Sequence, residues 1–400
     1  METINLNAGI KPVSFDDTSV AFSSKSDKEL EKMHLLFSTM NWKYPVKIGT
    51  FFVKTALKLK LPIKAIIKET LFKQFCGGET IEECKQTINN LSHYNIKTIL
   101  DYSVEGGKTD MYFDCAMNKI LEIIDIAAGS KAIPFAVFKM SGIGSAAILK
   151  KVQSGEQLAE LEQHEYELIE ARADKICRRA FEKNVPVLID AEESWFQGAT
   201  DELVYGLMKK YNKTRAIVFN TYQMYRTDMQ YNLERALEMA VTNKFILGLK
   251  LVRGAYIEKE RKWAQIHNYT SHVFDTKQET DNAYNYALGY CIKNIDHIEL
   301  VAGSHNETSN LLLTQLMQSA SISRSDRRIY FAQLYGMSDT ISYNLSNSGF
   351  NVAKYMPFGP VELVVPYLFR RAEENKAVTG HSNRELELIR KELQRRKNIV

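Results

Sequence analysis

Short apolar runs alternate with longer amphipathic segments from about residue 95 to the end of the chain. The runs are rich in β-branched or aromatic residues and read as strands at 97–103, 133–140, 185–192, 215–222, 245–254, 298–305, 328–334 and 351–357. Segments of helical length and period lie between them, at 155–184, 193–212, 228–244, 275–294 and 306–320. Strands that alternate with helices are typical of parallel βαβ units.

Eight such units favour an α/β fold of the (β/α)8 TIM-barrel type, and roughly 280 residues is a normal length for one. The alternative is a doubly wound open sheet, which would carry a GxGxxG turn after its first strand. Here the first strand is followed by SVEGGKT at 103–109, which is not that fingerprint. The same turn fails as a P-loop, because Tyr102 stands where the first glycine should be.

The regions before and after the barrel divide the chain into three parts. We expect an N-terminal helical arm at 1–92, the (β/α)8 barrel at 93–378 and a C-terminal helix at 379–400. The last helix has alternating charges and an apolar stripe of Leu386, Ile389 and Leu393, so it covers the barrel or pairs with a partner.

Segment 43–75 is rich in lysine with phenylalanine, leucine and isoleucine between. It reads either as a basic surface for peripheral contact with an anionic membrane or as an arm packed on the main domain with its lysines in water. The packed arm is favoured.

Composition narrows the class of protein. The 400 residues are 45% hydrophobic and 25% charged, as in an ordinary globular chain, and the net charge of +4 shows no basic stripe for nucleic acid. Five scattered cysteines without a CxxC pair indicate neither a disulfide framework nor a thiolate zinc site.

We find no secretory signal and no apolar stretch of about 18 to 20 residues. A bacterial cytoplasm is expected, with contact to the inner face of its membrane if the lysine-rich segment binds lipid. Oligomeric state is not readable.

In a (β/α)8 barrel, catalytic groups lie at the carboxyl ends of the strands. Every predicted strand ends in residues of this kind: Asp101, Glu105, Lys139, Asp190, Glu192, Asn220, Tyr222, Lys250, Arg253, Tyr256, Ser304, His305, Asn306, Gln333 and Tyr355. One such residue is usually a loop or capping residue, but eight strands that converge on one rim predict a site.

The segment YLFRRAEEN at 367–375 has a second pattern. Helical spacing places Tyr367, Arg370, Arg371 and Glu374 on one face. Paired guanidinium groups match a carboxylate bidentately, although most such runs are solvated helix faces.

Cations at the predicted rim outnumber acids, which suits a ligand with phosphates plus a second, smaller anion. A metal site built from Asp190, Glu192 and His305 is the competing interpretation. The histidines show no HxH or HExxH spacing, and the cations would oppose a divalent ion. We therefore expect no metal.

Nine motifs, taken in order, resemble the proline dehydrogenase family over about residues 95–376. They are LDYSVEG (100–106), FKMSGIG (138–144), IDAEES (189–194), FNTYQMY (219–225), KLVRGAYIEKE (250–260), GSHN (303–306), QLYGMSD (333–339), KYMPFGP (354–360) and YLFRRAEEN. The residues of these motifs are similar to those of the single-function enzymes of eukaryotic type.

The resemblance implies FAD-dependent oxidation of L-proline to 1-pyrroline-5-carboxylate, by hydride transfer to flavin N5, as the first step of proline degradation to glutamate. A membrane quinone is the implied electron acceptor. The eighth helix would lie over the barrel mouth, with Tyr367 as part of a lid. Arg370 and Arg371 would hold the proline carboxylate with Glu374 as their brace, and Tyr355 would pack against the proline ring.

Further roles come from the same resemblance. Lys139, paired with Glu105, would lie nearest the chemistry, with Asp190 in its hydrogen-bond network. FAD would be contacted by Asp101, Asn220, Lys250, Val252, Arg253, Gly254, Ala255, Tyr256, Ser304, His305, Asn306, Gln333 and Leu334. Asn220 replaces a glutamine of the bacterial pattern, and Ile257 stands where a tryptophan is common.

Two alternatives stay open at this stage. Hydroxyproline dehydrogenase would use the same scaffold, but a hydroxylated ring calls for a smaller or more polar residue at Tyr355. Outside the class lies a barrel that only binds its ligand, or a phosphate-ester hydrolase that uses the cationic rim without flavin.

Overall fold

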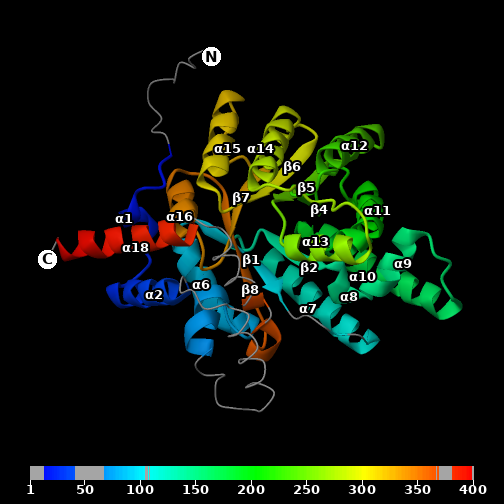
Figure 1. Ribbon diagram of the computed structural model, residues 1–400, viewed down its shortest axis with the longest axis horizontal. Coiled ribbons are helices and arrows are strands. Elements are labelled where there is room, and N and C mark those ends of the chain that lie inside the picture. The colour runs from blue at the N-terminus through cyan, green and yellow to red at the C-terminus, as the bar shows by residue number, and fades with distance from the viewer. Residues whose placement is uncertain are drawn as a thin grey trace.

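The computed structural model describes residues 13–40, 67–103, 107, 109–365, 367–368 and 381–398 (Figure 1). Eight parallel strands close into a barrel in chain order, which confirms the predicted fold. The strands are β1 (Ile96–Tyr102), β2 (Phe135–Lys139), β3 (Val187–Asp190), β4 (Val218–Gln223), β5 (Leu247–Val252), β6 (Ile298–Gly303), β7 (Ile329–Leu334) and β8 (Val352–Phe358).

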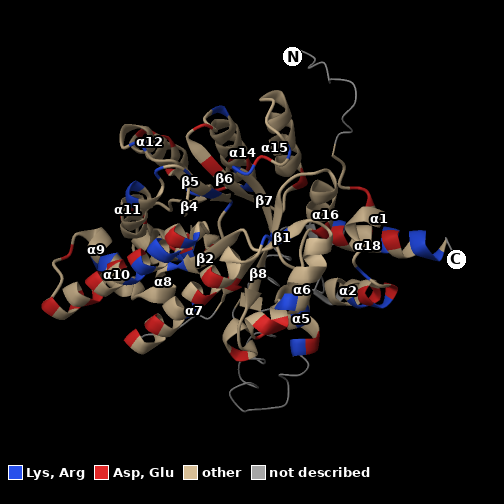
Figure 2. Cartoon of the chain, turned by 180° about the vertical axis from the view of Figure 1, so that it is seen from behind, with Lys and Arg blue, Asp and Glu red and all other residues tan. Residues whose placement is uncertain are grey.

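Helices surround the barrel, as Figure 1 shows. The outer layer consists of α7 (Asp110–Ala128), α10 (Glu160–Lys183), α11 (Ser194–Tyr211), α12 (Met229–Thr242), α14 (Lys277–Lys293), α15 (Glu307–Ser319) and α16 (Asp339–Asn347). Three additional helices lie in the loops after β2 and β5: α8 (Met140–Ile143), α9 (Ala146–Ser154) and α13 (Ile257–Ile266). Lys, Arg, Asp and Glu are interspersed over the described outer helices in Figure 2, without a stripe of one sign.

Strand register sorts the barrel residues into two sets. Ile99 pairs with Tyr355 and Phe135, and these side chains belong to the small core inside the barrel. Their neighbours in sequence, such as Leu100, belong to the larger core between sheet and helices. Because side chains alternate along a strand, position parity decides which side chains reach the lumen.

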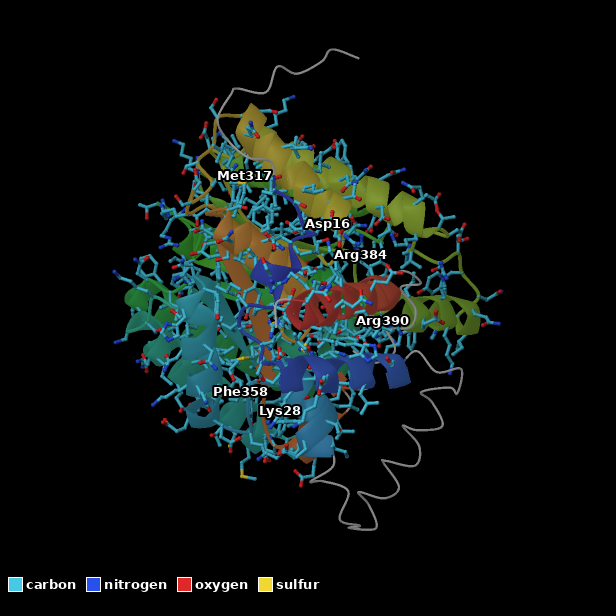
Figure 3. All side chains as sticks on the ribbon, turned by 90° about the vertical axis from the view of Figure 1, so that its left-hand side faces the viewer. Asp16, Lys28, Met317, Phe358, Arg384 and Arg390 are labelled. Carbon is cyan, nitrogen blue, oxygen red and sulfur yellow. The ribbon has the colours of Figure 1, made fainter. Side chains whose placement is uncertain are left out.

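The arm and the C-terminal helix share a separate small core. Helices α1 (Thr18–Ala21), α2 (Asp27–Met40) and α18 (His381–Lys397) lie together in Figures 1 and 3. Phe22 and Phe37 pack there against Leu386 and Ile389, which are two of the three residues in the predicted apolar stripe. Arg396 fastens the helices further, because it donates to the Phe22 carbonyl at 2.9 Å and to Asp27 at 2.7 Å.

The rest of the arm is described from residue 67 onward. Elements η1 (Lys68–Phe72), α5 (Lys73–Phe75) and α6 (Ile81–His93) lead into β1, and Phe72 and Phe75 are buried. Most of the lysine-rich segment, 43–66, lies outside the described residues, so its predicted packing stays a prediction, as do the predicted domain limits. Among the described helices, we find none with the length and apolarity needed to cross a bilayer.

Candidate functional site

A buried polar network joins three strands at the carboxyl end of the barrel. Asp190, the last residue of β3, accepts hydrogen bonds from the Lys250 ammonium of β5 and, at 2.8 Å, from the Tyr355 hydroxyl of β8. The Lys250 and Asp190 side chains are only 8% and 14% exposed. The Lys250 ammonium also lies 5.1 Å from the centre of the Tyr355 ring. Charge-assisted hydrogen bonds of this kind hold all three side chains in fixed positions.

A cavity of about 310 Å³ opens at the ends of the first three strands. Lys139, which pairs with Asp190 in the register of β2 and β3, lines it together with Asp101 and Glu192. Tyr256 and Trp195 form part of its wall. The cavity is lined by charged side chains of both signs together with these aromatic walls, so it suits a small polar organic ligand.

Two buried acids at this cavity have hydroxyl partners. Ser103 donates to Asp101, and Ser141 donates to Glu192 through its hydroxyl and, at 3.0 Å, through its backbone N–H. Burial raises the pKa of the Glu192 carboxyl to about 7, although the Ser141 hydrogen bonds and the charge of Lys139 oppose the shift. Glu192 therefore gains or loses its proton near neutral pH.

The turn after β5 presents a cation and two small residues. Arg253 donates to Asp281 at 2.6 Å, to the Ser304 hydroxyl at 2.8 Å and to the Ser309 hydroxyl at 2.9 Å. Gly254 has φ +125°, and a Cβ there would lie 1.6 Å from the Tyr225 ring. Only glycine fits this position, and both Gly254 and Ala255 are exposed, so a ligand can approach the backbone closely.

The turn after β6 forms the start of α15. Asn306 caps that helix by accepting from Ser309 N at 3.0 Å. His305 Nδ1 lies 2.9 Å from the Ser338 hydroxyl, in the turn after β7, and His305 Nε2 lies 3.5 Å from the backbone nitrogen of Leu334. A helix start next to Arg253 favours an anionic ligand group.

Two residues that we expected to contact FAD face the helices instead. Asn220 pairs in register with Ile189 and Leu249 and donates to Asp201 of α11 at 2.8 Å. Gln333 donates to the Ser304 carbonyl at 3.1 Å and accepts from Ser342 of α16 at 2.9 Å. Side chains alternate between the two sides of a strand, and these two lie on the side of the helices. This geometry does not support a contact between their side chains and FAD.

The remaining predicted site residues lie at the barrel rim, in a neighbouring cluster or outside the described residues. Val252 and Leu334 end their strands at positions that alternate toward the lumen, and Tyr367 is buried in a cluster with Val361 and Val364. Four predicted site residues lie outside the described part of the chain: Glu105, Arg370, Arg371 and Glu374. Within the described ranges, no three His, Cys, Asp or Glu side chains form a group that could hold a metal ion.

Gln223 is a rim residue that the sequence reasoning missed. It is the last residue of β4 and donates to the Glu192 carbonyl at 2.7 Å, while its oxygen lies 3.5 Å from Ala255 N. Gln223 therefore joins the cavity wall to the turn after β5. Phe219 belongs to the core inside the barrel, and every second residue of a strand lies on the same side of the sheet. Alternation from Phe219 therefore places Gln223, and not Asn220, on the lumen side.

A closed (β/α)8 barrel with a buried lysine, aspartate and tyrosine network at its carboxyl rim has the architecture of a barrel enzyme. The family model for proline dehydrogenase matches residues 84–384. The chain therefore belongs to the proline dehydrogenase family.

Individual relatives agree with this assignment. The carbapenem antibiotics biosynthesis protein CarD of Pectobacterium carotovorum is 36% identical over 80% of this chain and 83% of the relative. Proline dehydrogenase 1 of Dictyostelium discoideum, a mitochondrial protein by name, is 33% identical over 95% of this chain and 74% of the relative.

A crystal structure of proline utilization A from Bdellovibrio bacteriovorus is similar in fold, with a TM-score of 0.70 at 20% identity over 92% of this chain. This chain spans 40% of that longer protein, and at this identity the likeness shows the fold alone.

Proposed function

We propose that this chain oxidises L-proline to 1-pyrroline-5-carboxylate with FAD as its cofactor. Membership of the proline dehydrogenase family supports the reaction, and the observation that carries it is the lumenal network of Asp190, Lys250 and Tyr355 beside a cavity of about 310 Å³. FAD, when bound, supplies an acceptor at N5 for the hydride that leaves the carbon next to the ring nitrogen.

The described residues fit a flavin dinucleotide. Arg253 has the charge that a pyrophosphate needs, and the exposed Gly254 and Ala255 allow close approach to the backbone. Lys250 is 8% exposed and paired with Asp190, so we place it with the reacting end rather than with the pyrophosphate. The start of α15 beside Arg253 adds a helix N-terminus that favours a phosphate. These groups would hold the dinucleotide, while the lysine, aspartate and tyrosine network would support the reacting end.

The substrate roles rest on the network and on the sequence. Tyr355 would form one wall for the proline ring, because its hydroxyl is held by Asp190 and its ring orientation is therefore fixed. A substrate hydroxyl would meet this bulky ring, so proline is favoured over hydroxyproline. Arg370 and Arg371 would bind the carboxylate, with Glu374 and Tyr367 beside them, and Lys139 with Glu105 would lie nearest the amine. We assign no catalytic base, and proline would lose its amine proton before the oxidation.

Flavin content tests the class of enzyme directly. Purified protein should be yellow and should release FAD on denaturation. A colourless protein that takes up no added FAD would refute the oxidoreductase proposal and favour a barrel that only binds its ligand.

Two arginine variants test the substrate site. R370M and R371M should raise the KM for proline strongly while FAD stays bound, because a bidentate carboxylate contact is lost. R235M, at an exposed position on α12, is the matched control and should leave KM unchanged. Loss of FAD from the 370 and 371 variants would mean that these arginines serve the cofactor instead.

We also propose a membrane quinone as electron acceptor, reached by peripheral contact through the lysines of segment 43–66. Deleting the whole arm would expose the core that α2 shares with α18, so charge removal is the cleaner experiment. Replacing Lys54, Lys58, Lys60 and Lys64 by alanine should reduce flotation with anionic liposomes. Equal flotation of both proteins would exclude this segment as the contact.

A further inference from the structure

Two consecutive residues of α18 contact the start of α15, directly after the proposed flavin contacts of the β6 turn, and the turn after β7. Arg384 donates from Nε to Glu307, in the first turn of α15, at 3.3 Å, and its guanidinium also pairs with Asp16, as the labelled side chains in Figure 3 show. Glu385 accepts from the backbone N–H of Ser338 at 3.0 Å. The C-terminal helix therefore contacts the candidate site, although it lies far from the barrel strands in sequence.

Ser338 has an unusual conformation for the residue that precedes a helix. Its φ and ψ are +52° and 45°, in the left-handed region that non-glycine residues rarely adopt, and its side chain does not cap α16. The Glu385 carboxylate accepts from the N–H of Ser338 itself and lies at the start of α16, where a negative charge is favourable. The Ser338 hydroxyl makes no capping bond to α16, so it is available for another partner.

That partner is His305. Its Nδ1 lies 2.9 Å from the Ser338 hydroxyl, and its Nε2 lies 3.5 Å from Leu334 N. A backbone N–H can only donate, so Nε2 is the accepting nitrogen and Nδ1 carries the hydrogen that points at Ser338. Contacts at both nitrogens fix the tautomer and the ring orientation.

The surroundings of Glu385 indicate more than a helix contact. Its Oε1 oxygen is buried and has no hydrogen-bond partner among the described residues. The nearby charges are Asp339 and Lys354, which form an ion pair of 2.8 Å with each other. Burial of this carboxylate is costly, and the backbone N–H groups of Ser338 and Asp339 offset part of that cost, which ties Glu385 to the first residues of α16.

We propose that Glu385 is a positioning residue for His305: it holds Ser338 in the left-handed conformation, and the Ser338 hydroxyl then fixes the imidazole. Through this connection, α18 sets the position of a side chain at the flavin rim. The inference rests on the proposed function, since His305 is a flavin contact only if FAD binds there.

Four variants of the FAD-loaded enzyme test this connection. E385A removes the carboxylate, and E385Q keeps an oxygen that can accept from Ser338 N. S338A removes the hydroxyl while its backbone N–H remains. L388A is the control, because Leu388 is buried on the same helix and packs in the small apolar core that α18 shares with the arm.

E385A and S338A should each weaken FAD binding at least tenfold and shift the visible flavin spectrum, while E385Q stays within about threefold of wild type. L388A should lower the Tm and leave FAD affinity and spectrum unchanged. If E385A changes only the Tm, or if L388A alters the flavin as much as E385A does, the positioning role is refuted. Wild-type protein that binds no FAD would instead overturn the proposed function.

Discussion

Replacing Lys250 by methionine should destabilise the fold far more than removing a surface lysine. The ammonium is 8% exposed and pairs with Asp190, which is 14% exposed and, among the described residues, retains the 2.8 Å hydrogen bond from Tyr355 in the variant. Removing one partner of a buried ion pair leaves an uncompensated charge, which costs about 3–5 kcal/mol. Loss of the contact between the Lys250 ammonium and the buried Tyr355 ring adds up to about 2 kcal/mol.

A double-mutant cycle isolates the pair. D190N keeps an oxygen that can accept from Tyr355 but removes the charge that Lys250 balances. The K250M/D190N protein leaves no buried charge at this position, so it should be more stable than the sum of the two single variants predicts. We expect a coupling free energy of at least about 2 kcal/mol, because the residues share one buried network.

Urea unfolding, followed by tryptophan fluorescence and circular dichroism, gives the free energies. Each protein is measured at two FAD concentrations, since bound cofactor adds stability that a variant with weak binding would lose. K119M is the control, because Lys119 forms an exposed pair with Glu122 and its loss should change little. A cost below about 1 kcal/mol for K250M, or additivity within about 0.5 kcal/mol, would refute this account of the network.

Two further predictions concern backbone geometry and pH. G254A should lower the free energy of unfolding by about 2–4 kcal/mol, because an alanine at φ +125° meets the Tyr225 ring. G289A, in α14 with open space around it, should raise the free energy of unfolding by about 0.5–1 kcal/mol. Urea unfolding midpoints measure both effects, and equal effects of the two variants would contradict the argument. Burial raises the pKa of Glu192 from 4.5 to about 7, so the folded state binds this proton more tightly and stability falls as pH rises between these values. E192Q removes this pH dependence, so its free energy of unfolding should rise relative to that of wild type by up to about 3 kcal/mol between pH 4 and pH 8. Parallel stability profiles for the two proteins over this pH range would exclude the raised pKa.

The hydrophobic pattern alone was sufficient for the barrel and for the rim. Eight strands separated by helices can form only a few kinds of parallel sheet. When such a sheet closes into a barrel, the carboxyl ends of all its strands lie on one side. For this reason Lys139, Asp190, Lys250 and Tyr355 were predicted at one site, and the structure brings all four to the carboxyl end of the barrel.

The side of the sheet that each residue faces required the structure. Strands of a parallel barrel are buried on both faces, so they read as continuous apolar runs without a visible period of two. The family resemblance implied that Asn220 and Gln333 contact FAD, and the apolar pattern could not show on which side they lie. Their side chains bond Asp201 and Ser342 in the helical layer, and Gln223 joins the rim.

The sequence by itself determined the barrel, the family and the list of polar groups at the rim, because local periodicity and motif order encode them. Tertiary structure decided which distant segments meet. The apolar stripe on α18 indicated that the helix is covered, but an amphipathic pattern does not name its partner, and the structure identifies it as the arm. Glu385 beside Ser338, 47 positions apart, is the same kind of contact. Only the packed chain brings these residues together, since no periodicity links residues so far apart.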